Sequence, residues 1–258
     1  MAVSATMTLM LVFGHISDTH LDGGERALAR TRRVMAYLRG LPLDAILITG
    51  DIADHGAPHE YERARAELTA DVPVLMLPGN YDERSAYRKV MLGHNGVAPI
   101  NEARWIDDVL FALCDSSIPG RDEGLLSAET LAWLRGVLSG TDAPVFVCLH
   151  HPPVPLHNAL IDQIRLAESE KLAALIEECP QVVAVLSGHA HTAAVSTFAG
   201  RPLLVAPGVV STLRLPWTTA KELTWANTID FDDPPAVAFH VLDHGGRLTT
   251  HYRVVPTS

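Results

Sequence analysis

The chain has 258 residues, of which 48% are hydrophobic and 19% are charged, and its formal net charge is −10. This length and composition suit one large globular α/β domain and exclude a disordered chain. The negative charge disfavours a nucleic-acid polymer or an anionic membrane as the main partner. A small anionic substrate remains compatible with it if bound metal ions supply positive charge locally.

Strand and helix patterns alternate along most of the chain. Short apolar runs predict strands, and apolar residues at helical spacing predict helices between them. The expected strands are residues 10–17, 45–49, 74–78, 109–114, 145–149 and 182–187, and the expected helices are residues 24–39, 58–70, 83–92, 128–138 and 165–178. Such alternation is typical of parallel strands with helices outside the sheet.

After His191 the pattern changes to short strands joined by tight turns. The expected strands here are residues 193–199, 203–206, 236–243 and 247–255. We expect this meander to form a second, more antiparallel sheet. The fold class is then α/β, a four-layer α/β/β/α sandwich of two mixed sheets flanked by helices. We expect one domain over 1–258, with a strand–helix core at 9–192 and the meander at 193–258.

Residues 207–235 fit neither pattern and are rich in Pro, Thr and Trp. A loop of this length in a compact domain is usually functional or disordered. We expect it to lie near the functional site or to form a subunit contact. Trp217 or Trp225 could stack on a nucleotide base, although a place in the core is the commoner role for such side chains.

The cysteines and the first apolar run bear on the compartment. Three cysteines in an odd number without metal-site spacing, Cys114, Cys148 and Cys179, predict reduced thiols of a cytoplasmic protein. The run 7–13 lacks a positively charged lead-in and a small-residue cleavage pattern, so we expect a strand rather than a signal peptide. No apolar run is long enough to span a bilayer.

Five apolar runs end in residue types that bind metals. The motifs that follow them are Asp18-Thr19-His20, Gly50-Asp51-Ile52-Ala53-Asp54, Gly79-Asn80-Tyr81-Asp82, His150-His151 and Gly188-His189-Ala190-His191. Ligands collect beyond the carboxyl ends of strands in open α/β sheets. Residues two apart on an extended segment point to the same side, and the glycines allow sharp turns at positive φ. Imidazole, carboxylate and amide groups suit divalent Mn, Fe, Co or Zn.

The order of these motifs resembles that of the calcineurin-like metallophosphoesterases. The stretches HISDTHL (15–21), LHHPPVPL (149–156) and GHAH (188–191) are most similar to class III cyclic nucleotide phosphodiesterases and the related bacterial glycerophosphodiesterases. The resemblance implies the same four-layer sandwich and two divalent metal ions. The ligands that it implies are Asp18, His20 and His191 for one ion, Asn80, His150 and His189 for the other, and Asp51 as the bridge.

The implied reaction is hydrolysis of a small phosphodiester, either a cyclic nucleotide or a glycerophosphodiester, by a hydroxide that bridges the metals. Two ions can stabilise both the attacking and the leaving oxygen, and they lower the pKa of a bound water to about 7. The expected catalytic residues are Asp51, Asn80 and Tyr81. The expected substrate contacts are Asn80, Tyr81 and His157, the last because the LHHPPVPL loop borders the substrate in the family.

Three neighbours of the ligands have supporting roles in this interpretation. Asp54 is expected to orient a ligand histidine or to brace its loop. Asp82 is expected to support the site or to begin the 83–92 helix. His151 is expected to be structural, because the family pattern assigns metal binding to the first histidine of the pair.

Tyr81 departs from the family pattern, which has histidine at this position. A phenol can donate a hydrogen bond to phosphate, but its ordinary pKa near 10 makes it a poor general acid. Three readings stay open: a preference for good leaving groups, proton donation by another group or a coordinated water, or slow catalysis.

Other functions also stay open. The same metal core could serve a phosphomonoesterase or protein phosphatase, and a non-catalytic metal-binding scaffold could keep the fold. A scaffold would be expected to lose ligands, whereas every implied ligand position is filled here. The native metal pair, the physiological substrate and the oligomeric state are left open, and a homo-oligomer is compatible with the sequence.

Overall fold

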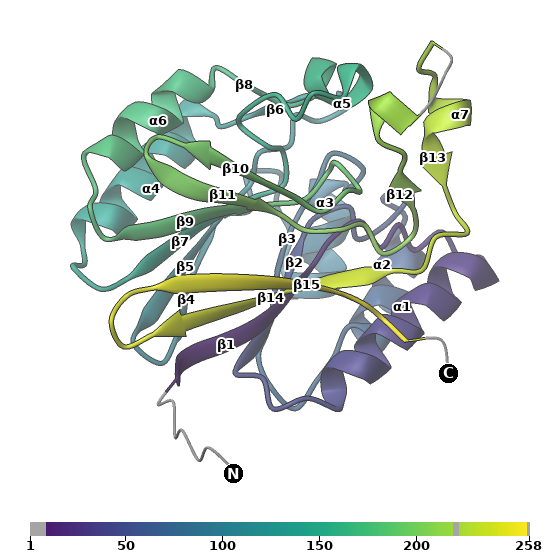
Figure 1. Ribbon diagram of the computed structural model, residues 1–258, viewed down its shortest axis with the longest axis horizontal. Helices are drawn as coiled ribbons and strands as arrows, with labels where there is room; N and C mark the ends of the chain where they lie inside the picture. Colours follow the sequence, from purple (N-terminus) through teal and green to yellow (C-terminus); the bar gives the residue numbers. More distant parts are fainter. Residues whose placement is uncertain (1–8, 219–221, 257–258) are drawn as a thin grey trace.

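Two β-sheets lie face to face at the centre of the computed structural model, which describes residues 9–218 and 222–256 (Figure 1). The first sheet has the order β15 (Leu248–Val254), β14 (Ala236–Asp243), β1 (Leu9–Ile16), β2 (Ala45–Thr49) and β3 (Val74–Leu77). The second has the order β10 (Ala194–Phe198), β11 (Arg201–Val205), β9 (Val182–Ser187), β7 (Val145–Leu149), β5 (Val109–Cys114) and β4 (Glu102–Ile106). Residues 7 and 8 of the first apolar run lie outside the described residues.

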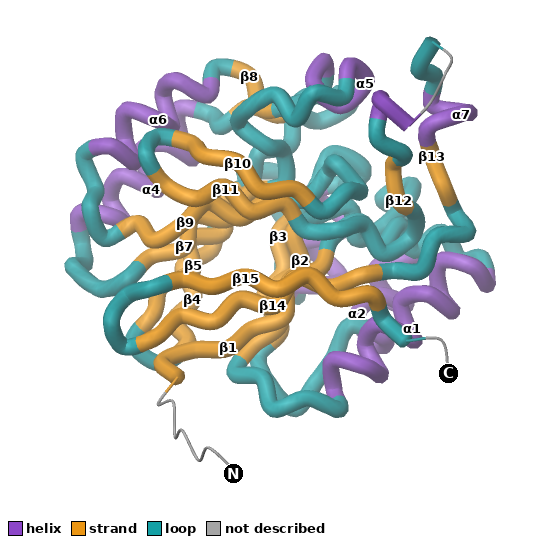
Figure 2. Tube along the Cα trace, in the orientation of Figure 1, coloured by secondary structure: helices purple, strands orange, loops and turns teal. Residues whose placement is uncertain are grey.

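Helices cover both outer faces of this pair of sheets, with strands at the centre (Figure 2). The helices α1 (Glu25–Arg39), α2 (Pro58–Glu67) and α3 (Arg84–Tyr87), together with the π-helical η1 (Arg88–Leu92), lie on the side of the first sheet, and α4 (Ala128–Ser139) and α6 (Ser169–Glu177) lie on the side of the second. The predicted α/β/β/α sandwich of two mixed sheets is therefore confirmed. No helix in the described ranges is long and apolar enough to cross a membrane.

Side-chain alternation along the strands produces three apolar layers. On β2, Ile46 and Ile48 pack against α1 and α2, whereas Leu47 faces the space between the sheets. On β7, Val147 packs toward α4 and α6, and Phe146 faces the same inter-sheet layer. Continuous apolar runs are needed because each central strand is buried on both faces.

The expectation that the C-terminal strands form a sheet of their own is wrong. Strand β14 pairs antiparallel with β1 in the first sheet, and β11 pairs parallel with β9 in the second. Each sheet therefore contains strands from both parts of the chain, and each contains both parallel and antiparallel pairs. The sequence pattern gives the strands but not their partners, because pairing is decided by long-range packing.

Several elements differ from their predicted bounds. The edge strand β4 was not predicted, because three of its five residues are exposed and its apolar pattern is weak. The helix expected over 165–178 begins only at Ser169, since Leu166 and Ala167 form β8 and pair with β6 (Gly124–Leu125). The short helix α5 (Ala159–Gln163) comes directly before β8 in the chain.

The segment 207–235 contains short regular elements rather than one loop. These are β12 (Thr212–Leu213), the 3-10 helix η2 (Pro216–Thr218), α7 (Trp225–Thr228) and β13 (Ile229–Asp230), and residues 219–221 lie outside the described part of the chain. Strands β12 and β13 pair with each other and not with either main sheet. We call the described residues of this segment, 207–218 and 222–235, the C-terminal lobe.

Candidate metal centre

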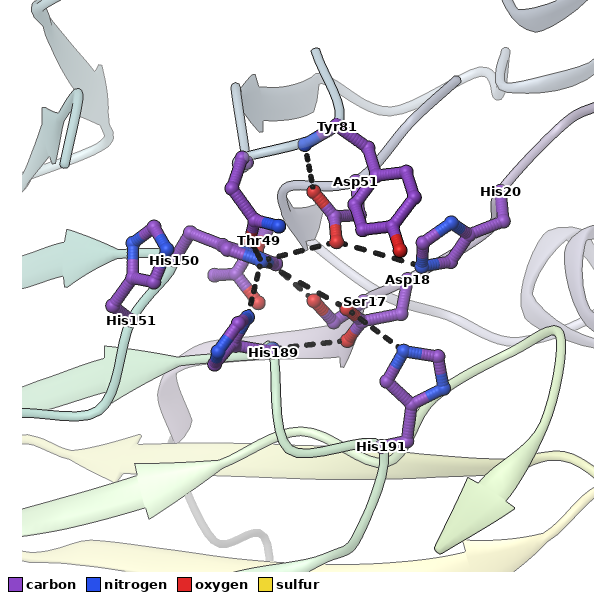
Figure 3. Close-up of polar contacts among 12 residues, drawn as sticks. Ser17, Asp18, His20, Thr49, Asp51, Tyr81, His150, His151, His189 and His191 are labelled. Carbon is purple, nitrogen blue, oxygen red and sulfur yellow. Dashed lines mark hydrogen bonds and ion pairs between the residues drawn. The ribbon is translucent and has the colours of Figure 1, made fainter. Parts of the chain in front are cut away.

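The motifs at the ends of five strands meet in one place (Figure 3). Strands β1, β2 and β3 belong to the first sheet, and β7 and β9 to the second, so the centre lies where the carboxyl ends of both sheets come together. Its buried polar side chains include Asp18, His20, Asp51, His150 and His189. This place agrees with the general position of ligand sites in α/β sheets.

One group of ligand atoms surrounds Asp18 and His20. The Nε2 atom of His191 lies 3.4 Å from Asp18 Oδ1, and His20 Nε2 lies 3.4 Å from Asp51 Oδ2. Side-chain donor atoms of Asp18, His20 and His191 all lie within 4.8 Å of one another. These are the three residues expected to hold the first ion.

A second group surrounds His150. Its Nε2 atom lies 3.3 Å from Asp51 Oδ2 and 3.1 Å from Asn80 Oδ1. His189 Nδ1 lies 3.2 Å from the same His150 nitrogen. Asp51 Oδ2 is therefore close to histidines of both groups, which is the position that a bridging ligand requires.

The backbone at these residues is strained rather than extended. Positive φ angles occur at Asp18 (56°), His20 (40°), Asp51 (49°), His189 (66°) and His191 (50°). The expectation that D-x-H and H-x-H place both side chains by lying on extended segments is therefore wrong. Left-handed backbone at non-glycine residues is uncommon and costs free energy, and it gathers at functional sites.

Two glycines serve this geometry in different ways. Gly50 has φ 96°, and a Cβ atom there would also press against the ring of His150. Gly79 does not have positive φ, but a Cβ atom on it would collide with the carboxylate of Asp51. The predicted backbone freedom is used at Gly50, whereas Gly79 supplies space.

Three of the histidines expected to bind metal are oriented through their Nδ1 atoms. His20 Nδ1 donates to Asp54 Oδ1 at 2.8 Å, as expected for Asp54, and His150 Nδ1 donates to the Thr49 carbonyl at 2.6 Å. His191 Nδ1 lies 2.8 Å from the Ser211 hydroxyl. Such bonds fix the ring and leave Nε2 unprotonated for a metal ion. Ser211 was missed by the sequence reasoning, because it lies in an unpatterned segment.

Asp82 and His151 support the loops around the centre. The Asp82 carboxylate accepts hydrogen bonds from the backbone N–H groups of Ile52, Ala53 and Gly79. His151 has partners on both ring nitrogens, Ser116 Oγ at 2.8 Å and the Asp122 carbonyl at 3.1 Å. Although His151 lies near two ligand histidines, neither of its nitrogens is left for a metal ion.

The charges of the centre attract cations. Burial opposes a charge on His150, yet the nearby Asp51 carboxylate raises the pKa of His150 to about 9. Burial also works against the charge of Asp51, but His150 and His20 hold the pKa of its carboxyl far below the ordinary value. Protons bound at these imidazoles neutralise the carboxylates when no cation is present.

The residues present fit divalent metal ions. Asp18 Oδ1 and His20 Nε2 are buried and have no hydrogen-bond partner among the residues that the structure describes. A buried polar atom without a partner costs free energy unless something else satisfies it. Imidazole, carboxylate and amide donors without a thiolate suit ions of the Mn, Fe, Co and Zn type.

Tyr81 lies beside the centre, whereas His157 does not. The backbone N–H of Tyr81 donates to Asp51 Oδ1 at 3.0 Å, and its ring packs edge-on against His20 with centroids 4.8 Å apart. Burial and the nearby carboxylate of Asp51 raise the pKa of the Tyr81 phenol above its ordinary value. His157 is exposed, and it does not line the cavity next to the centre.

A cavity of about 400 Å³ opens beside the centre. Its polar side includes His20, Asp51, Asn80, Tyr81, His189 and His191. Its remaining walls are mainly apolar and come largely from α5 and the C-terminal lobe. This volume is in the range of small-molecule sites.

Comparison with known proteins points to one family. The model of the calcineurin-like phosphoesterase family matches residues 11–193. The chain is 35% identical to a glycerophosphodiester phosphodiesterase of Enterobacter lignolyticus, over 78% of both chains. It is 37% identical to a cAMP/cGMP dual specificity phosphodiesterase of Mycobacterium tuberculosis, over 74% of this chain and 65% of the relative.

Solved structures show the same fold. A dimetal phosphatase from Danio rerio superposes with a TM-score of 0.72, covering 96% of this chain and 97% of the other. The two sequences are only 18% identical, so this similarity concerns the fold alone.

Proposed function

The chain belongs to the calcineurin-like phosphoesterase family and is a metallophosphoesterase, and on this premise we propose that it hydrolyses a small phosphodiester with two bound divalent metal ions. The two substrate classes that we propose are those named for its relatives, a cyclic nucleotide and a glycerophosphodiester. Both of these relatives are named as diesterases, which favours a diester over the phosphomonoester considered as an alternative.

One observation carries the proposal. His20 Nε2 and His150 Nε2 lie 3.4 and 3.3 Å from Asp51 Oδ2. Asn80 Oδ1 and His189 Nδ1 lie next to His150 Nε2. The Nδ1 atoms of both histidines already donate elsewhere, so in their neutral forms these rings turn lone pairs toward the carboxylate. Facing acceptors repel one another unless protons or cations lie between them. The same arrangement would also suit the non-catalytic metal-binding scaffold, so the assay for hydrolysis separates the two.

Each of the two ions has its own ligand group in the proposal. The ligands are Asp18, His20 and His191 for one ion and Asn80, His150 and His189 for the other, with Asp51 shared. When bound, the ions would supply Lewis acidity to a phosphoryl oxygen and lower the pKa of a coordinated water. Their identity within the Mn, Fe, Co and Zn group is supported only by the donor types.

The protein's own groups would orient the phosphate. Asn80 and Tyr81 line the cavity at the edge of the centre, where an amide N–H and a phenol O–H can donate to phosphoryl oxygens. The raised pKa keeps the Tyr81 phenol protonated at neutral pH, so it acts as a donor and not as a base. We keep His157 as a substrate contact only by resemblance to the family loop.

The wider setting is also part of the proposal. Cys114, Cys148 and Cys179 are free, which supports a reducing, cytoplasmic location. We propose one domain over the whole chain, a small-molecule substrate rather than a nucleic-acid polymer or membrane, and a homo-oligomer as a state to be measured.

The test is an assay of the purified protein for metal content and for hydrolysis with Mn²⁺. The substrates are bis(p-nitrophenyl) phosphate, p-nitrophenyl phosphate, cyclic AMP and glycerophosphoethanolamine. We expect bound metal and faster hydrolysis of diesters than of the monoester. A protein that binds no metal and hydrolyses none of these compounds would contradict the proposal.

The control compares two aspartates at opposite ends of the parallel strands of the first sheet. Asp51 lies in the centre beyond the carboxyl ends of β2 and β3, whereas the exposed Asp71 precedes the amino end of β3. Asp51→Ala should abolish activity and Asp71→Ala should leave it unchanged. Activity retained in Asp51→Ala would reject this site.

A further inference from the structure

The cavity beside the metal centre has an apolar side that the proposed chemistry does not use. The residues of this side are Ile161, Ile164, Val210, Leu213, Trp225, Ile229 and Phe231. The first two belong to α5 and its C-terminal cap, and the other five belong to the C-terminal lobe. Since Asp51, Asn80 and His191 line the same cavity, a phosphate at the centre would direct an ester group toward this side.

Two aromatic rings of the lobe are presented to the cavity with much of their surface uncovered. Trp225 is 44% exposed and Phe231 is 39% exposed, although both line the cavity. Trp217 is 71% exposed in the same lobe, but it is not among the residues that line the cavity. Aromatic side chains that stay partly exposed in a cavity gain free energy by stacking or packing edge-on against a flat ligand group.

An arginine extends this aromatic side. The guanidinium carbon of Arg26 lies 3.8 Å above the centre of the Phe231 ring, and Arg26 also lines the cavity. Within residues 9–218 and 222–256, this guanidinium makes no ion pair or hydrogen bond. Its donors are therefore free for acceptor atoms of a ligand, and a guanidinium can itself stack against a flat group.

The lobe is held in place by the next arginine of the same helix. Arg30, one turn after Arg26 on α1, donates to the backbone carbonyls of Val209, Phe231 and Asp233 at 2.6 to 3.0 Å. These bonds attach the lobe to α1 and place Phe231 under Arg26. The Phe231 part of the aromatic side is thus prearranged, which lowers the ordering cost of binding.

We propose that Arg26, Trp225 and Phe231 form a subsite for a flat, weakly polar ester group of the substrate. This inference rests on the proposed function, because the phosphate at the metal centre fixes where the ester group lies. A polyol group would lose hydrogen bonds with water against the apolar side and regain few of them. A planar ring buries apolar surface there and keeps its edge acceptors within reach of Arg26.

The test uses phosphonates, which bind through one anionic group and cannot be hydrolysed. Binding of phenylphosphonate, methylphosphonate and a dihydroxybutylphosphonate to the Mn²⁺-loaded protein is measured by calorimetry. We expect phenylphosphonate to bind about tenfold more tightly than the dihydroxybutyl compound, as one stacking contact allows. Trp225→Ala and Phe231→Ala should each remove most of this preference and leave methylphosphonate binding unchanged.

Matched variants separate the subsite from general effects. Trp217→Ala removes an exposed tryptophan of the same lobe that does not line the cavity, so the preference should persist. Arg26→Met keeps the length of the stem without the guanidinium and should reduce the preference about threefold. Unchanged methylphosphonate affinity shows that each variant is folded.

Three results would overturn the subsite. The first is equal affinity for the three phosphonates, and the second is no binding of phenylphosphonate at millimolar concentration. The third is a loss of the phenylphosphonate preference in Trp217→Ala that is as large as the loss in Trp225→Ala. Phosphonoacetate carries a carboxylate in addition to its phosphonate. If it binds more tightly than phenylphosphonate, and if this difference disappears in Arg26→Met, Arg26 belongs to a second anion site instead. If diesters are not hydrolysed but the phenyl preference follows Trp225, only the proposed function fails.

Discussion

The metal centre and the C-terminal lobe form two sides of one cavity, and they are built in opposite ways. The centre consists of strand ends from both sheets, most of its proposed ligands are buried, and three of its histidines are oriented by hydrogen bonds on Nδ1. The lobe has only short elements outside the two main sheets, and it presents half-exposed aromatic rings.

Under the proposed function, the centre carries the hydrolysis of the phosphodiester and the lobe carries the choice between substrates. Residues at buried strand ends have little freedom, so they can hold candidate ligand atoms within 4.8 Å of one another at the cost of strained backbone. The start of the lobe is fixed to the end of β1, because the backbone N–H groups of Val209 and Val210 donate to the carbonyls of Ser17 and Asp18. Its exposed aromatic side chains, in contrast, can change without disturbing the sheets. We therefore expect variants in the centre to affect all substrates and variants in the lobe to affect only some.

The largest expected effect is at the residue shared by both ligand groups. Asp51→Asn removes a carboxylate charge that faces His20 and His150, and kcat/KM should fall by more than about 100-fold for every diester. Steady-state kinetics with an aryl and an alkyl diester measure this. If kcat/KM falls for only one of the two diesters, the centre does not act on all substrates alike, and the division of roles between centre and lobe is wrong.

The next effect is at groups that orient the ligand histidines. Asp54→Asn and Ser211→Ala weaken the bonds to His20 Nδ1 and His191 Nδ1, and metal affinity should fall by about 10- to 100-fold. Competition with a chelator measures the affinity. Ser211 belongs to the lobe by sequence, so its variant is also a sharp test: the phenylphosphonate preference of the metal-saturated protein should not change. Wild-type metal affinity in both variants would show that the orienting bonds do not matter.

A third effect concerns acid stability beneath the centre. His15 and His240 are buried in contact, with His15 Nδ1 and His240 Nε2 3.1 Å apart, and burial lowers the pKa of His240 to about 3. The unfolded chain then binds more protons than the folded one below the ordinary value of 6.5, so stability falls as the pH falls. Between pH 7 and pH 5 this histidine alone should reduce the free energy of unfolding by about 2 kcal/mol.

Urea unfolding in EDTA measures this loss without interference from metal binding. The variant His240→Gln keeps a polar group near Thr250 Oγ1, which lies 2.8 Å from His240 Nδ1, but it does not titrate. Its stability should change less over the same pH range. A variant with the same pH dependence as the wild type would refute the role of His240.

The smallest expected effect concerns the tyrosine between the two regions. Tyr81→His introduces a better proton donor at neutral pH, and it should increase the hydrolysis of an alkyl diester by up to about tenfold. Bis(p-nitrophenyl) phosphate has a good leaving group and should gain little. Rates for the two diesters, measured side by side, test this; no gain with the alkyl diester would show that Tyr81 does not limit protonation.

The sequence allowed most strands and the candidate ligands to be predicted, because both depend on local patterns. Buried runs such as Ala45–Thr49 are continuous and apolar, and Asp51 follows at once. The exposed edge strand β4 carries no such pattern, and the pairing of β14 with β1 joins residues more than 200 positions apart. The sequence does not record such pairings.

The sequence by itself determined the strand ends, the donor types, the order of the motifs and the substitution of tyrosine at position 81. Only the tertiary structure decided that Asp51 lies between two ligand groups, that Ser211 orients His191, and that Arg26 covers Phe231. The physical reason is the distance along the chain over which each kind of interaction acts. Apolar periodicity and turn chemistry act over a few residues, whereas a site joins side chains that meet only after both sheets have packed.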